Sequence, residues 1–176
     1  MSNIQLDYSD IMDIFKEKLK IDNIVKKVSS IFLNQRYAGK INYKPYFQRN
    51  YVWDEEKATY FIESILLGTE IPPLVLFQTK DKNEVIDGRQ RYETIKRFLE
   101  DKLVLKDKGL HNLKALAGKR YSQLDSDTRE LFEDTRIRIL QFSVVDEPKL
   151  DEEKEENSFG IIFCVLRWNS DCKHIF

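Results

Sequence analysis

The sequence predicts a domain of mixed α/β class. Helical patterns at residues 54–66 and 89–100 alternate with short apolar runs of strand character at 74–77 and 84–86. The order strand, helix, strand pair, helix, strand is typical of this class. A hydrophobic content of 41% and a charged content of 34% suit a chain that forms a core and keeps a solvated surface.

The first third of the chain is expected to hold helices and one extended segment. A helix is predicted at Tyr8 to Lys18, and a second at Asp22 to Asn34, where Ile and Val recur at helical spacing. The segment Lys40 to Gln48 is expected to be extended, with Pro45 marking an edge. Asp54 is the expected N-cap of the next helix, whose apolar stripe comprises Ala58, Phe61, Ile62, Ile65 and Leu66.

Pro72 and Pro73 prevent that helix from continuing, and further strands and helices are predicted after them. Strands are predicted at Leu74–Phe77, Glu84–Ile86, Leu103–Leu105 and Arg136–Val145, and helices at Arg89–Glu100 and Asp125–Glu133. Residues 146–157 carry seven Asp or Glu residues and are expected to be a linker or an exposed helix face. We therefore divide the chain into an N-terminal helical extension (1–20), an α/β domain (21–145), and an acidic linker with an atypical tail (146–176).

Composition excludes several classes of function. The 29 Lys and Arg residues balance 30 Asp and Glu residues, so DNA contact would need a local basic cluster. The only cysteines, Cys164 and Cys172, make no disulfide framework, and with His111 and His174 they give no zinc spacing, so no metal site is predicted. No signal peptide is recognised and no apolar run approaches the roughly 20 residues of a membrane span, which favours a cytoplasmic protein with no membrane partner.

The most informative segment is the turn from Asp87 to Arg91, which reads Asp-Gly-Arg-Gln-Arg between a strand and a helix. The first amides of a helix lack internal partners and carry partial positive charge, so they bind anions. Gly88 lets a ligand approach the backbone, and Arg89 and Arg91 can bind phosphate oxygens. Gln90 is suited to orienting a water molecule or a ribose.

This turn also has less specific explanations. Asp87 could cap the helix, or hold a metal or a sugar hydroxyl. Asp-Gly turns before helices are common, and arginines on helices are usually solvated. Arg91 could equally pair with Glu70 or Glu84.

A second cluster, residues 45–53, places four aromatic residues around Gln48 and Arg49. Aromatic faces and arginines can stack on bases. Packing in the core is the simpler role for Phe47 and Trp53, whereas Arg49 needs a stated partner. If the sheet brings Arg49 beside Asp87, one anion pocket would contain three arginines.

Other charged groups fit surface positions. Glu55, Glu56 and Glu63 lie on one predicted helix and are expected to be solvated. His111 lies in a loop without the Ser, Cys or Asp partners of a nucleophile, so no catalytic role is predicted for it.

These motifs together resemble the N-terminal domain of GmrSD-type modification-dependent restriction and phage-defence proteins, a family similar to ParB and sulfiredoxin in fold. The matching features are the Gln-Arg pair with Tyr-Val-Trp (48–53), Ser-Ile-Leu-Leu-Gly (64–68), Ile-Pro-Pro (71–73) and Gly-Lys-Arg-Tyr-Ser-Gln-Leu (118–124). The family signature Asp-Gly-Gln-Gln-Arg corresponds to residues 87–91. The resemblance covers roughly residues 21–145 and implies a ParB/sulfiredoxin-like sheet with flanking helices.

The resemblance also implies a function, namely binding and hydrolysis of an NTP, with or without Mg²⁺, coupled to DNA sensing. Asp87 and Gln90 are then the candidate catalytic residues. The candidate nucleotide- and phosphate-binding residues are Gln48, Arg49, Gly88, Arg89 and Arg91. The chain departs from the family at Arg89, where Gln is usual; this adds charge and puts nucleotide preference and hydrolysis in doubt.

The resemblance also implies that a His-Asn-His nuclease domain commonly follows in this family; these 176 residues hold no such His cluster, so they are not expected to cut DNA by that route, and a nuclease-bearing partner chain is one partner to look for. We interpret the tail as a frameshift product arising near residues 159–164, because both cysteines arrive where the pattern is lost; genomic DNA would test this. Two other functions stay open. One is a DNA-binding module without catalysis, and the other is a non-functional, truncated fragment.

Overall fold

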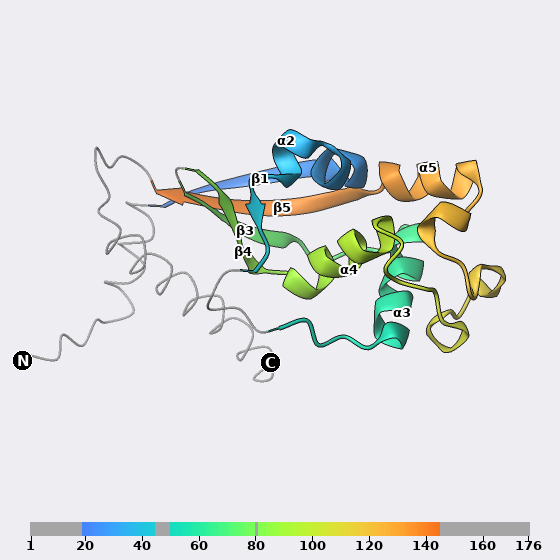
Figure 1. Ribbon diagram of the computed structural model, residues 1–176. Helices are drawn as coiled ribbons and strands as arrows, with labels where there is room; N and C mark the ends of the chain where they lie inside the picture. Colours follow the sequence, from blue (N-terminus) through green and yellow to red (C-terminus); the bar gives the residue numbers. More distant parts are fainter. Residues whose placement is uncertain (1–18, 45–49, 80, 145–176) are drawn as a thin grey trace, which may run out of the picture.

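The fold is a five-stranded mixed sheet with helices packed against it, which confirms the predicted mixed α/β class. The computed structural model describes residues 19–44, 50–79 and 81–144 (Figure 1). The strands are β1 (Leu19–Lys27), β2 (Ile41–Asn42), β3 (Leu74–Gln78), β4 (Asn83–Asp87) and β5 (Arg136–Val144). Their order is β1-β5-β3-β4-β2, with antiparallel β1–β5 and β3–β4 pairs and parallel β3–β5 and β2–β4 pairs.

Helices α3, α4 and α5 begin and end close to the predicted positions. They are η1 (Ser29–Leu33, a π-helix), α2 (Gln35–Ala38), α3 (Glu55–Leu66), α4 (Arg89–Leu99) and α5 (Ser126–Asp134), with three short 3₁₀ turns between α4 and α5. The Asp54 carboxylate accepts the Lys57 N–H at 2.7 Å, which confirms Asp54 as the cap of α3. Figure 1 shows α5 leading directly into β5, and α4 starting where β4 ends.

One core joins the sheet to the helices. The predicted apolar stripe of α3 is buried, and so are Tyr92, Ile95 and Phe98 of α4. These side chains pack against Leu74, Leu76, Val85, Ile137 and Ile139 from the three central strands. Alternate residues of a strand point to the same face of the sheet, so these are the residues that reach this core. The contact also holds the start of α4 against the end of the sheet.

The predicted helix at Asp22 to Asn34 is wrong over its first half, because residues up to Lys27 belong to β1. Ile24 lies opposite Ile139 of β5 and packs against the core, whereas Val25 lies opposite Arg138 and is exposed. The β-branched residues that suggested a helical stripe instead alternate across a nine-residue antiparallel ladder with β5. Helical spacing holds only from Val28 onward.

The strand predicted at Leu103–Leu105 is also wrong. Leu103 and Leu105 are fully buried, as the apolar run suggested. However, the backbone of Leu105 bonds to a loop and not to a strand: its N–H donates to the Lys119 carbonyl, and its carbonyl accepts from the Gly118 N–H. Apolar residues in a short run can thus be buried as part of a loop, because periodicity cannot separate these cases.

Glu63 is not a surface charge, in contrast to the prediction, whereas Glu55 and Glu56 are exposed as expected. Glu63 is only 1% exposed, and its two carboxylate oxygens accept the backbone N–H groups of His111, Asn112 and Leu113 at 2.7–3.0 Å. Burial raises the pKa of Glu63, but these amide hydrogen bonds outweigh that effect and hold the pKa below its ordinary value. Glu63 therefore fixes the loop after α4 to α3.

Several predictions lie outside the described residues. They concern the helix at Tyr8 to Lys18, the acidic stretch and tail after Val144, and the cluster residues from Pro45 to Arg49. Among the described residues, no helix is long and apolar enough to cross a membrane.

Candidate functional site: the start of helix α4

The candidate site is built by a sharp strand-to-helix turn. Strand β4 ends at Asp87 and helix α4 begins at Arg89, with Gly88 as the single residue between them. Gly88 has a φ of +91°, and a Cβ built there would lie 2.6 Å from Leu74 Cδ2 and 3.0 Å from Arg91 Nη2. Only glycine combines this backbone conformation with such close neighbours.

The first turn of α4 presents backbone N–H groups that no N-cap side chain accepts. The first α-helical bond is donated by Tyr92 N–H to the Gly88 carbonyl at 2.8 Å. The amides of Gln90 and Arg91 precede it and belong to the positive end of the helix dipole. Amides at such a helix start can bind an oxyanion, and binding at this turn stays a prediction.

Arg91 lies against this turn and bonds to both flanking segments. Its Nη2 donates to the Asp87 carboxylate at 2.9 Å and to the Pro73 carbonyl at 3.1 Å. Neither of the alternative partners is used, because Glu70 pairs with Arg138 and Glu84 accepts from Asn42. The Arg91 Nε is buried without a hydrogen-bond partner among the described residues. Arg91 therefore has unused donor capacity next to the helix start.

Asp87 and Arg89 differ in the solvent exposure of their side chains. The side chain of Asp87 is 60% exposed, whereas that of Arg89 is 7% exposed. The Nε of Arg89 lies 3.5 Å from a carboxylate oxygen of Glu93, one turn further along α4. The extra positive charge that Arg89 brings to the family signature is thus compensated locally by Glu93.

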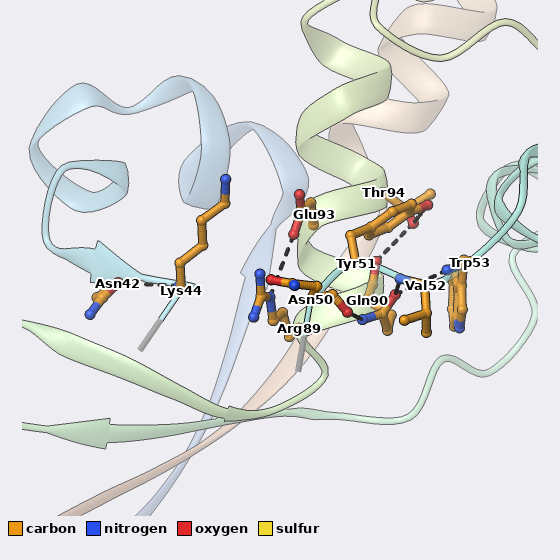
Figure 2. Close-up of polar contacts among 10 residues, drawn as sticks. All are labelled: Asn42, Lys44, Asn50, Tyr51, Val52, Trp53, Arg89, Gln90, Glu93 and Thr94. Atoms are coloured by element: carbon orange, nitrogen blue, oxygen red, sulfur yellow. Dashed lines mark hydrogen bonds and ion pairs between the residues drawn. The ribbon is translucent and has the colours of Figure 1, made fainter. Parts of the chain in front are cut away.

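Gln90 connects α4 to the segment before α3 (Figure 2). Its Oε1 accepts the backbone N–H groups of Val52 at 2.9 Å and Trp53 at 3.3 Å, and its Nε2 donates to the Asn50 carbonyl at 3.1 Å. Two N–H donors facing one atom identify that atom as the amide oxygen. The side chain of Gln90 therefore binds backbone on both of its ends.

A second contact joins the same two segments (Figure 2). The hydroxyls of Tyr51 and Thr94 lie 2.9 Å apart, and Thr94 donates to the Gln90 carbonyl at 2.7 Å. The Tyr51 hydroxyl is therefore the donor to Thr94. Trp53 packs edge-on against Phe61 at the margin of the core, which confirms its predicted packing role.

The structure thus gathers the five predicted residues 87–91 at one turn, whereas Gln48 and Arg49 lie outside the described residues. Sequence reasoning missed Glu93 and Thr94. Each follows a signature residue by four positions, Glu93 after Arg89 and Thr94 after Gln90, and this spacing places side chains together on a helix. That spacing is the signal that could have found them.

Another depression, of about 530 Å³, lies at the start of α3. Acidic and basic side chains line it, and Lys106 pairs with Glu55 and Lys108 with Glu56. The two remaining carboxylates are engaged as well, because Asp54 caps α3 and Asp107 lies 3.4 Å from the Lys114 ammonium. Within the described parts of the chain, no three His, Cys, Asp or Glu residues are grouped to hold a metal ion.

Comparisons with known proteins identify one family. The family model of the GmrSD restriction endonuclease N-terminal domain matches residues 8–167. This match extends beyond both ends of the 21–145 range that carries the sequence resemblance. Neither the curated proteins nor the solved structures gave a match, so the ParB/sulfiredoxin likeness in fold stays a prediction.

Proposed function

The chain belongs to the family of GmrSD restriction endonuclease N-terminal domains, and from this premise we propose that it binds the phosphates of a nucleotide at the start of α4. Membership assigns the chain to a restriction and phage-defence system. The NTP, its hydrolysis and the sensing of DNA belong to our proposal.

One observation carries the proposal, namely that Arg91 has a buried Nε without a partner beside helix amides that no N-cap side chain accepts. A phosphate group has several acceptor oxygens and a negative charge, so it satisfies both kinds of donor. The Asp87 carboxylate would compete with the phosphate for Arg91. Because Asp87 is mostly exposed, it can turn toward water at little cost when the phosphate binds.

The remaining predicted residues take the following places in the proposal. Asp87 is the exposed carboxylate, available for catalysis or for Mg²⁺ bound mainly through phosphate oxygens. The predicted catalytic role of Gln90 is untested, and its hydrogen bonds to the backbone of Val52, Trp53 and Asn50 support a positioning role in its place. Gln48 and Arg49 stay predicted phosphate ligands, since they precede Asn50, whose carbonyl is bonded to Gln90. Arg89 contributes less net charge than its sequence position suggests, because Glu93 pairs with it.

A thermal-shift screen of NTPs, with and without Mg²⁺, tests the proposal on the full chain. A ligand at about 100 times its Kd stabilises the folded state by about 2.7 kcal/mol, so Tm should rise by several degrees. Arg91→Ala should abolish the shift. Arg138→Ala is the matched control, since Arg138 also forms one 2.9 Å ion pair but lies on β5. A screen in which no NTP raises Tm would count against nucleotide binding.

DNA sensing is the part of the proposal that rests on family membership alone. We expect a labelled DNA duplex to bind with an affinity that falls as salt rises, because Lys and Arg contacts to phosphates release counterions. Fluorescence anisotropy titrations with and without the NTP would measure this affinity for DNA. Binding that needs no nucleotide and survives Arg91→Ala would favour a DNA-binding module without catalysis.

A further inference from the structure

We infer that Gln90 is a positioning residue, whose side chain fixes the backbone of Asn50 to Trp53 beside the first turn of α4 and so sets the affinity for the nucleotide. This inference rests on the proposed function. It assigns Gln90 a role different from orienting a water molecule or a ribose.

The first step is the hydrogen-bonding capacity of the amide. A Gln side chain offers one oxygen with two lone pairs and one nitrogen with two N–H donors. Both lone pairs of Gln90 are taken by Val52 and Trp53, and one N–H is taken by Asn50 (Figure 2). No lone pair is left with which Gln90 could accept a hydrogen bond from an attacking water molecule.

The second step concerns the segment that Gln90 holds. Val52 is 70% exposed, so its side chain adds little to the packing of this segment. Tyr51 holds the segment through its hydroxyl contact and through its ring, which lies 4.7 Å from the Arg97 guanidinium of α4, and Trp53 holds it through its ring contact with Phe61. Gln90 supplies three of the hydrogen bonds between the segment and α4, more than any other described side chain there.

The third step links this contact to affinity. Asn50 to Trp53 lie beside the turn that would receive the phosphate, because Gln90 is itself in the first turn of α4. A segment that must be ordered when a ligand binds lowers affinity by the conformational entropy it loses, whereas a segment fixed beforehand does not. Gln90 would therefore act on binding and leave the chemical step unchanged.

The first measurement is amide hydrogen exchange by NMR in the full-length chain. Gln90→Met keeps the shape of the side chain but removes its hydrogen bonds. Exchange at Val52 and Trp53 should become faster, while exchange in the interior of α4, for example at Ile95, should not change. Gln90→Glu should keep both amides protected, because a carboxylate also accepts two N–H groups. Gln123→Met is the matched control, since Gln123 accepts one backbone N–H, from Arg120, away from this site.

The second measurement compares nucleotide Kd with the rate of hydrolysis at saturation. Gln90→Met should raise Kd by about 10-fold and leave the saturated rate within about 2-fold of wild type. An unchanged Kd, or a saturated rate that falls by about 100-fold or more, which is the typical size of a lost acid–base contribution, would overturn the inference.

The two measurements separate the inference from the proposed function. If the wild-type chain binds no NTP, the proposed function fails, and the exchange data still report on the hydrogen bonds of Gln90. If the NTP binds but exchange at Val52 and Trp53 is the same in Gln90→Met as in wild type, the positioning role is wrong while the proposed function stands.

Discussion

Glu63 and Gln90 each hold a distant segment to a helix, in two different regions of the molecule. Glu63 does so with a carboxylate and Gln90 with an amide. Each is a helical side chain whose oxygen accepts backbone N–H groups from a segment about 40 to 50 positions away in sequence. Glu63, on α3, holds the loop at 111–113. Gln90, on α4, holds the segment at 50–53. Two distant connections are thereby fixed to the core by side chains and not by the sheet.

The regions differ in charge and burial. Glu63 is fully buried and ionised, with both oxygens bonded, whereas Gln90 is neutral and only partly buried. A buried carboxylate that loses its hydrogen bonds leaves an uncompensated group in the core, but an amide at the surface can be replaced by water. The comparison predicts that the Glu63 contact maintains the fold and that the Gln90 contact is available for tuning a site.

The largest expected effect comes from Glu63→Gln. The variant offers one acceptor oxygen where the carboxylate offered two, and it turns an N–H donor toward backbone N–H groups. The free energy of unfolding should fall by about 3 kcal/mol, measured by urea denaturation. Glu56→Gln on the same helix, an exposed position paired with Lys108, should change it by less than about 0.5 kcal/mol. Equal effects at the two positions would contradict the structural role of Glu63.

Acid should remove the stabilisation that the Glu63 carboxylate gives to the fold. The pKa of Glu63 is held below its ordinary value in the folded state, so the carboxylate stabilises the fold above that ordinary value. This stabilisation should be lost as pH falls through the lowered folded-state pKa. Urea denaturation of wild type and Glu63→Gln at pH 6 and below pH 4 would measure the loss. The stability difference between them should shrink in acid; a constant difference would mean that the ionised form is not the one that matters.

Gln90→Met should have a smaller effect on stability. Its three hydrogen bonds are lost, but Asn50 and Val52 are exposed and Trp53 is only partly buried, so water can replace part of what is lost. We expect a fall of about 1–2 kcal/mol in the free energy of unfolding by the same method. A loss as large as that of Glu63→Gln would break the distinction between the two contacts.

Tyr51→Phe should have the smallest effect, about 0.5–1 kcal/mol, because it removes one hydroxyl donor to Thr94 and keeps the ring. Tyr60→Phe, on an exposed residue of α3, provides the control and should be neutral within about 0.5 kcal/mol. If the nucleotide Kd rises in Tyr51→Phe as well, the role assigned to Gln90 belongs to the whole contact between the two segments.

Sequence reasoning succeeded where the cause was local. The cap at Asp54, the stripes of α3 and α4, and the glycine turn at Gly88 follow from the spacing of neighbouring residues and from backbone geometry. It failed where a distant segment decided the outcome. Residues 22–27 became a strand because β5 pairs with them, and Glu63 became buried because the 111–113 loop supplies its amides.

The sequence alone determined the mixed α/β class, the family and the turn at residues 87–91, because the chemistry of that turn is contained in five consecutive residues. The pairs Arg89–Glu93 and Asp87–Arg91 join residues four positions apart and so belong to the local sequence. Only the tertiary structure decided the distant partners: it bonded Arg91 to the Pro73 carbonyl and engaged Gln90 with the backbone of Asn50 to Trp53. Such choices depend on which groups the fold brings within hydrogen-bonding distance, and a side chain's own sequence neighbourhood does not contain that information.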